Sequence, residues 1–123
     1  NYSYDASGNL LRVTMPDTVA PTVYSTDPVD GAVYVPVDQT VYVTFSENVQ
    51  PGDNYGNIAM KSGGTVVGIT YSIASKVLII DPAENLNYST SYAVYIPAGA
   101  VMDTRGNALA GDYSFIFATM PVP

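Results

Sequence analysis

The chain has no cysteine and no histidine among its 123 residues. Without thiols it can form neither a disulfide framework nor a thiolate zinc site, and without imidazole it lacks the base of Ser/His and Cys/His mechanisms. These absences exclude the most familiar zinc-dependent and nucleophilic enzymes. Exported domains often avoid thiol chemistry, so the missing cysteine also fits a secreted, extracellular location.

Basic residues are scarce: four Lys and Arg stand against eleven Asp and Glu, for a net charge of −7. They lie far apart in the sequence, at Arg12, Lys61, Lys76 and Arg105. Nucleic acid and anionic membrane surfaces would repel such a chain, so neither is an expected partner. No apolar run approaches the roughly 18 residues of a membrane span, so we expect no membrane insertion. Any export signal is expected outside this segment.

Helical patterns are also missing, because apolar residues do not recur at helical spacing over several turns. Instead, residues 40–46, 91–96 and 113–119 alternate apolar and polar side chains with the period of a strand. Weaker strands are predicted at 22–26, 32–35, 57–61, 65–73 and 76–80. Turn clusters rich in Pro, Gly, Asp and Asn separate them. With 47% hydrophobic residues, the chain has enough apolar surface for one core, and the pattern predicts a β-sandwich, with a small barrel as the alternative.

A leucine precedes a tyrosine by six residues at the start of segment 91–96, as Leu86 and Tyr92. In Greek-key sandwiches this spacing is typical of a tyrosine corner, in which the tyrosine hydroxyl bonds to the backbone just upstream. That bond fixes the connection between the two sheets. We therefore predict structural roles for Tyr92 and Leu86.

Residues 1–20 differ from the rest of the chain. The pattern around residues 5–9 predicts a β-hairpin or strand extension, followed by a linker over residues 15–21. An isolated hairpin is marginally stable in water, so we expect it to pair with an exposed sheet edge, its own or a neighbour's, by β-strand addition. Its predicted contact residues are Tyr2, Tyr4, Leu11 and Val13. The predicted organisation is an extension and linker at 1–20, a domain at 21–120, and a tail or the start of a linker at 121–123.

Groups of residues follow one another in a recognisable order from Pro21 to Thr119. They are 21–23 with 25–28 and 30–32, then 43–49, 86–96, 96–101, 103–107, and 113–115 with 117–119. Together they resemble the bacterial Ig-like domain of the S-layer (SbsA) type. The resemblance implies an all-β, Ig-like antiparallel Greek-key β-sandwich of about seven to eight strands, here with an N-terminal β-hairpin or strand extension. Such domains occur in strings on S-layer proteins, adhesins and secreted enzymes as spacers or scaffolds, and bring no catalytic residues.

The N-terminal extension has a resemblance of its own. Tyr4 and Asp5, followed by Gly8, Asn9 and Leu10, resemble a YD repeat of the Rhs type. The match covers barely one repeat.

Oxygen ligands are predicted to converge at one end of the sandwich. In an Ig topology the segment after residue 46 and the segment at 103–107 lie at the same end, which would bring Glu47 close to Asp103 and Asn107. These residues form a candidate Ca²⁺ site, the only cofactor that the sequence suggests. The alternative is turn chemistry, in which the aspartate accepts backbone N–H bonds and Gly106 supplies a positive φ. The pattern Asp-x-x-Gly-Asn occurs twice, at 5–9 and 103–107, which favours this alternative.

Catalysis is not expected. Paired carboxylates for glycoside hydrolysis need one member in an apolar pocket, which raises its pKa. The available acidic residues all lie in turn-rich, polar segments, namely Glu47, Asp53, Glu84, Asp103 and Asp112.

Tyrosine is unusually abundant, with 11 residues. Tyr92 and Tyr113 share a face with apolar neighbours and are predicted in the core, whereas Tyr42 and Tyr95 are predicted to point outward. Outward tyrosines can pair across strands, pack against a neighbouring domain or stack on sugar rings.

From these observations we predict a structural or interaction module of an extracellular bacterial surface protein, S-layer or fibre. It would act as a spacer or as a self-associating building block that contacts neighbouring domains or copies of itself. The alternative is an adhesin or accessory domain that binds carbohydrate or another surface through exposed tyrosines, with or without Ca²⁺.

Overall fold

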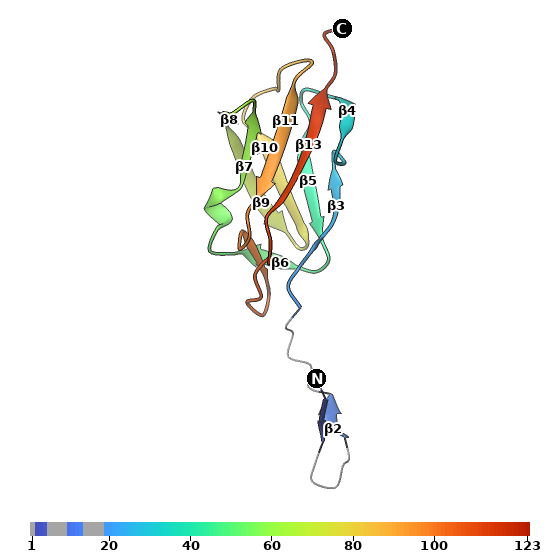
Figure 1. Cartoon of the computed structure of the whole chain (residues 1–123), viewed down its shortest axis with the longest axis vertical. Coiled ribbons are helices and arrows are strands. Elements are labelled where there is room, and N and C mark those ends of the chain that lie inside the picture. The colour runs from blue at the N-terminus through green and yellow to red at the C-terminus, as the bar shows by residue number, and fades with distance from the viewer. Residues whose placement is uncertain (1, 5–9, 14–18) are drawn as a thin grey trace.

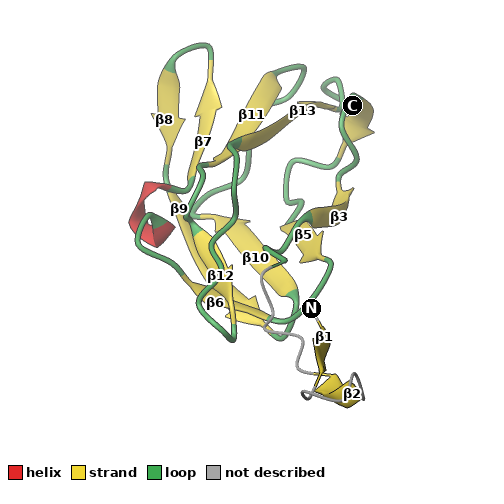
Figure 2. Ribbon diagram, turned by 60° about the horizontal axis from the view of Figure 1, so that its bottom comes forward, coloured by secondary structure: helices red, strands yellow, loops and turns green. Residues whose placement is uncertain are grey.

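The computed structural model describes residues 2–4, 10–13 and 19–123. Two β-sheets pack face to face as a sandwich (Figure 1). In spatial order, the first sheet contains β3 (Val23–Asp27), β5 (Val41–Phe45), β10 (Val77–Pro82) and β9 (Ile69–Ala74). The second contains β4 (Ala32–Val35), β13 (Tyr113–Thr119), β11 (Ser91–Ile96), β7 (Ala59–Ser62) and β8 (Thr65–Val67). A small pair, β6 (Val49–Pro51) and β12 (Val101–Asp103), lies at one end, and a short 3-10 helix, η1 (Tyr55–Asn57), precedes β7 (Figure 2).

The predicted all-β sandwich is confirmed, and two separate sheets replace the alternative of a barrel. The prediction of one strand over residues 65–73 is wrong. The chain leaves the second sheet after β8 and joins the first as β9, with Gly68 between them. Apolar and other residues continue to alternate through Gly68, so the sequence pattern does not show that the chain passes from one sheet to the other. The two sheets therefore hold four and five strands, nine together, whereas the sequence predicted about seven to eight.

The core lies between the inward faces of the two sheets. β5 shows the alternation most clearly, because Val41, Val43 and Phe45 are buried while Tyr42 is exposed between them. Leu78 and Ile80 of β10 lie beside them in the same sheet. The facing sheet contributes the buried residues Met60, Tyr92, Val94, Ile96, Phe115 and Phe117. Burial of these apolar side chains is the main stabilising term of the fold.

The second strand of the sandwich, β4, runs in the same direction as the last, β13. β13 pairs in parallel with β4, with Phe117 beside Ala32 and Thr119 beside Val35. The chain enters the sandwich at one end and leaves it at the opposite end (Figure 1). We call these the N-terminal end, where β6 and β12 lie, and the C-terminal end.

The N-terminal segment forms a sheet of its own from β1 (Tyr2–Tyr4) and β2 (Leu10–Val13). The strands are antiparallel, with Tyr2 opposite Val13 and Tyr4 opposite Leu10. The predicted turn at 5–9, residues 14–18 of the linker, and the side chains of Tyr2, Tyr4, Leu11 and Val13 lie outside the described residues. Within the described ranges, no helix has the length and hydropathy needed to cross a membrane.

Candidate functional site

The Asp103 side chain organises the turn that follows β12 at the N-terminal end. Asp103 is fully buried, and its Oδ1 accepts hydrogen bonds from the backbone N–H groups of Arg105 at 2.9 Å and Asn107 at 2.8 Å. Its Oδ2 accepts a third from Asn107 Nδ2 at 2.9 Å. Gly106 has a φ of +90°, the left-handed conformation that this turn needs. The carboxylate thus binds donors of its own loop.

The structure brings Asp103 and Asn107 together, and it places Glu47 just before β6, whose Val49 pairs with Asp103. The described contacts nevertheless favour the turn alternative over a Ca²⁺ site. The Asn107 amide donates to the carboxylate, and the described part of the chain contains no group of three or more acidic residues that could hold a metal ion. Ca²⁺ needs six to eight converging oxygens.

A second set of backbone bonds joins the turn after β6 to the segment before β12. Gly52 N–H donates to the Ala100 carbonyl at 3.0 Å, and Asn54 N–H donates to that of Gly99 at 3.0 Å. Asn54 Nδ2 also donates to the Ala98 carbonyl at 2.7 Å. These bonds close the N-terminal end of the sandwich. The side-chain amide of Asn54 therefore acts as a structural donor.

Tyr92 fixes the connection between β10 and β11. Its hydroxyl accepts a hydrogen bond from the backbone N–H of Asn87, five residues upstream, at 2.8 Å. Its ring stacks on Phe117 with centroids 5.8 Å apart, and Leu86 is buried beside this connection. The Thr119 hydroxyl donates to the Asn87 carbonyl, so both backbone groups of Asn87 are bonded. This geometry is that of a tyrosine corner.

Replacing Tyr92 with phenylalanine is expected to lower the free energy of unfolding by about 1–2 kcal/mol, because the Asn87 N–H loses its acceptor in a half-buried site. Chemical denaturation of both proteins measures the change. Tyr42→Phe is the matched control, since Tyr42 is 40% exposed on the outer face of β5. Equal losses in the two variants would show that the Tyr92 hydroxyl has no special role.

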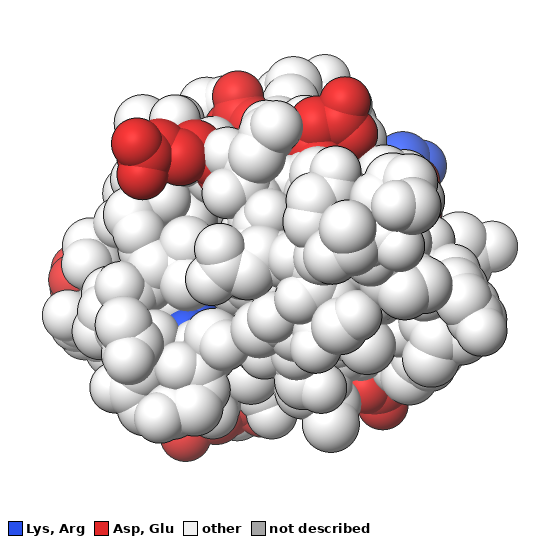
Figure 3. All heavy atoms as spheres, turned by 90° about the horizontal axis from the view of Figure 1, so that it is seen from above, with Lys and Arg blue, Asp and Glu red and all other residues white. Residues whose placement is uncertain are grey.

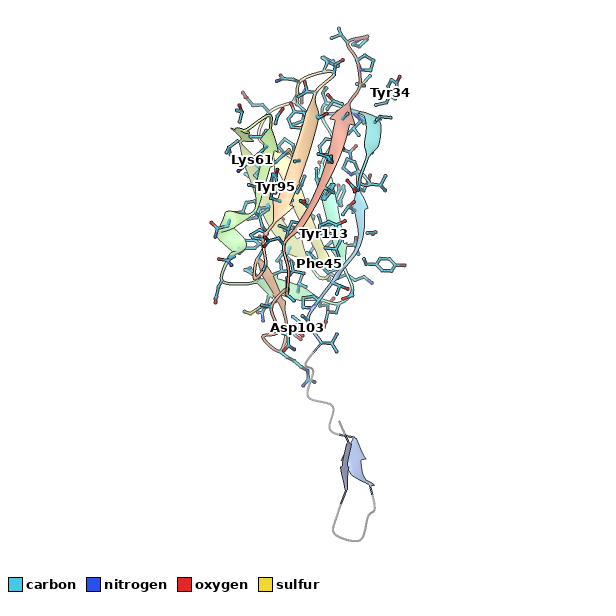
Figure 4. The ribbon with its side chains drawn as sticks, viewed as in Figure 1. Tyr34, Phe45, Lys61, Tyr95, Asp103 and Tyr113 are labelled. Carbon is cyan, nitrogen blue, oxygen red and sulfur yellow. The ribbon has the colours of Figure 1, made fainter. Side chains whose placement is uncertain are left out.

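The two outward tyrosines lie on opposite faces of the sandwich. Tyr42 lies on the outer face of the first sheet and is 40% exposed, while Tyr95 lies on that of the second and is 43% exposed. The Lys61 Nζ lies 5.5 Å from the centroid of the Tyr95 ring, in cation–π contact. Figure 4 shows Lys61, Tyr95 and Tyr113 in succession along the second sheet toward the N-terminal end.

The prediction that Tyr113 lies in the core is wrong. Tyr113 is half-buried, packs on Phe115 with ring centroids 6.1 Å apart, and lines a surface hollow of about 300 Å³ beside Tyr95. It occupies the first position of β13, where the sandwich ends and solvent reaches the ring. Asp112 and Asn57 line the same hollow. The sequence alone does not indicate that these residues meet, because they come from three separate segments.

A tyrosine pair spans the open side of the sandwich between η1 and β9. Tyr55 and Tyr71 make an edge-to-face contact with centroids 5.0 Å apart, and the Tyr55 hydroxyl donates to the Tyr71 carbonyl at 3.3 Å. Burial, and secondarily the neighbouring Tyr71, raise the pKa of the Tyr55 phenol above its ordinary value. The raised pKa favours the protonated phenol, which is the form that donates this bond.

Comparison with known proteins places the chain among sandwich domains. A sequence model described as "Bacterial Ig-like domain" matches residues 17–119. The solved structure of CopC from Methylosinus trichosporium OB3b is similar with a TM-score of 0.65 and 16% identity, over 84% of this chain and 96% of that one. The N-terminal part of the bacterial S-layer protein SbsC is similar with a TM-score of 0.60 and 18% identity, over 85% of this chain but only 25% of that one. At such identities the similarity concerns the fold alone. No curated protein matches the chain.

Proposed function

Because the chain belongs to the family of bacterial Ig-like domains, we propose that it is a load-bearing structural module of an extracellular surface protein, joining neighbouring domains. One observation carries this proposal. The chain enters through β3 at one end of the sandwich and leaves at the other after β13, which pairs in parallel with β4 (Figure 1). Modules with this path can be linked end to end. The fold that the chain shares with a fragment of an S-layer protein supports the same setting.

The pairing also determines how the module responds to tension. Force applied through the two ends passes through β3, which pairs with β5, and acts along β4 and β13, while the hydrogen bonds between β4 and β13 lie across that direction. The bonds are therefore loaded in shear and must fail together rather than one after another. They include Gly31 N–H to the Ile116 carbonyl at 2.7 Å and Met120 N–H to the Val35 carbonyl at 2.9 Å.

The C-terminal end offers a surface for the next domain. Tyr34, Tyr88 and Val122 are exposed there by 72%, 39% and 69%. Backbone bonds hold their segments together, because Met120 N–H donates to the Val35 carbonyl and Ser89 N–H donates to that of Met120. Seen from this end, the surface is largely uncharged, and its carboxylates lie toward the margins (Figure 3). A chain with a net charge of −7 can meet another acidic module here with little repulsion.

Replacing Asp30 with alanine is expected to lower the force at which the module unfolds when it is pulled through its ends. The Asp30 Oδ1 accepts a hydrogen bond from the Ile116 N–H at 3.0 Å and so extends the β4–β13 ladder by one bond. At equilibrium the loss should be only about 1 kcal/mol. Single-molecule force spectroscopy on tandem repeats of the module measures the force, and denaturation measures the equilibrium stability.

Asp53→Ala is the control, since Asp53 is an exposed carboxylate in the turn after β6, at the N-terminal end. It should leave the unfolding force unchanged. If Asp30→Ala has the same force as the wild type while its equilibrium stability falls, the β4–β13 ladder is not the load-bearing element and the proposal is wrong.

A further inference from the structure

The second sheet has a hollow near its N-terminal end, of about 300 Å³. Its walls include Tyr95, Tyr113, Asp112, Asn57 and Ser114. The registers of the strands bring these residues together, because Tyr95 lies opposite Ser114 and Ile96 lies opposite Tyr113. Asn57 enters from the end of η1, just before β7. The volume of the hollow is at the lower limit for small-molecule sites.

The polar groups of the hollow are held in place. The Asp112 Oδ1 accepts a hydrogen bond from the backbone N–H of Ala98 at 2.8 Å, which fixes the carboxylate at the rim. The Asn57 Nδ2 donates to the Asn54 Oδ1 at 3.3 Å, which orients the Asn57 amide in the same way. A carboxylate and an amide fixed beside an aromatic ring can meet a ligand with little loss of side-chain entropy.

The Tyr95 ring is also positioned by its neighbours. The Lys61 Nζ lies 5.5 Å from its centroid and comes from β7, on the side of Tyr95 away from Tyr113 (Figure 4). The lysine therefore supports the ring from outside the hollow, while 43% of the tyrosine stays exposed. An aromatic ring held this way presents apolar area with a hydroxyl at its edge.

We propose that this hollow binds a neutral or N-acetylated saccharide. The C–H face of a sugar ring would stack on Tyr95, and its hydroxyl groups would donate to Asp112 and bond to Asn57. Acidic sugars are disfavoured, because Asp112 lies in the hollow and the chain carries a net charge of −7. The exposed aliphatic residues of the same sheet, Val33, Val66 and Ile116, lie outside this hollow, so the hollow differs from a purely apolar protein-docking face.

An NMR titration of the whole chain tests the proposal, with cellobiose, maltose, xylobiose and N,N′-diacetylchitobiose as probes at millimolar concentration. At least one sugar should shift the backbone amides of Asn57, Tyr95 and Ser114 saturably. Tyr95→Ala should weaken that binding about tenfold or more, in line with the loss of one stacking contact. Asp112→Asn should weaken it less, because an amide oxygen still accepts hydrogen bonds.

The matched control is Tyr42→Ala, which removes a similarly exposed tyrosine from the opposite sheet and should leave binding unchanged. The amide spectrum of each variant without sugar shows whether it is folded. The proposal is overturned if none of the four sugars shifts these amides saturably, or if Tyr95→Ala binds as well as the wild type. If the same amides shift with protein concentration and do not respond to sugar, the hollow contacts a second copy of the chain, and the proposal is also overturned. The outcome is independent of the load-bearing function, which force measurements test separately.

Discussion

Replacing Asp103 with alanine is expected to destabilise the module by about 3 kcal/mol, enough to lower its Tm by more than about 10 °C. The fully buried carboxylate is the acceptor for three donors, the backbone N–H groups of Arg105 and Asn107 and the side-chain amide of Asn107. Without it these donors lose their partners, and the turn can no longer hold Gly106 in its left-handed conformation. Thermal and chemical denaturation measure the loss.

The stability of Asp103→Asn should fall between those of the wild type and Asp103→Ala. Its amide oxygen can still accept a hydrogen bond, while its amide nitrogen faces the former donors. Asp38→Asn, at an exposed aspartate in the connection between β4 and β5, should change stability by less than about 0.5 kcal/mol. If addition of Ca²⁺ raised the Tm of the wild type but not that of Asp103→Ala, Asp103 would be a metal ligand, and the interpretation as a turn would be wrong.

Replacing Gly52 with alanine is expected to destabilise the module by about 2–4 kcal/mol. A Cβ atom on Gly52 would lie 2.3 Å from the Gly99 carbonyl oxygen and 3.2 Å from the Val101 carbonyl carbon. Both neighbours are backbone, which cannot rotate away as a side chain would. Gly52 N–H also donates to the Ala100 carbonyl, so the two segments cannot separate without losing that bond. Denaturation curves measure the change.

Gly111→Ala is the control for this substitution, because a Cβ on Gly111 would meet no atom within 4 Å. Its stability should equal that of the wild type within about 0.5 kcal/mol. If Gly52→Ala were as stable as Gly111→Ala, the close approach of the two segments would not be needed for the fold.

The features of the fold that depend on local pattern could be predicted from the sequence. β5, β11 and β13 alternate strictly because one face of each meets the core, and that period is visible in the residues alone. The spacing of Leu86 and Tyr92 likewise predicts the position of the tyrosine corner. β6 and β12 were missed because each has only three residues, too few to display a period.

The candidate sites were predictable only in part, for a physical reason. Asp103 and Asn107 lie four residues apart, so their proximity follows from local geometry. The donors that fill the Asp103 carboxylate are mainly backbone groups, which have no signature in the sequence. The hollow at Tyr95 depends on strand pairing over long separations in sequence. Asn57, Tyr95 and Asp112 meet there, and no local pattern indicates that they do.

The central claim is that the module bears tension through β4 and β13, and the direction of pulling tests it most directly. Because the chain has no cysteine, pairs of introduced cysteines provide unique attachment points. Pulling between Val19→Cys and Val122→Cys loads the ladder in shear. Pulling between Tyr34→Cys and Val122→Cys opens the ladder from its C-terminal end, since Thr119 pairs with Val35 there. We expect a severalfold higher unfolding force in the first geometry, and equal forces in the two geometries would contradict the claim.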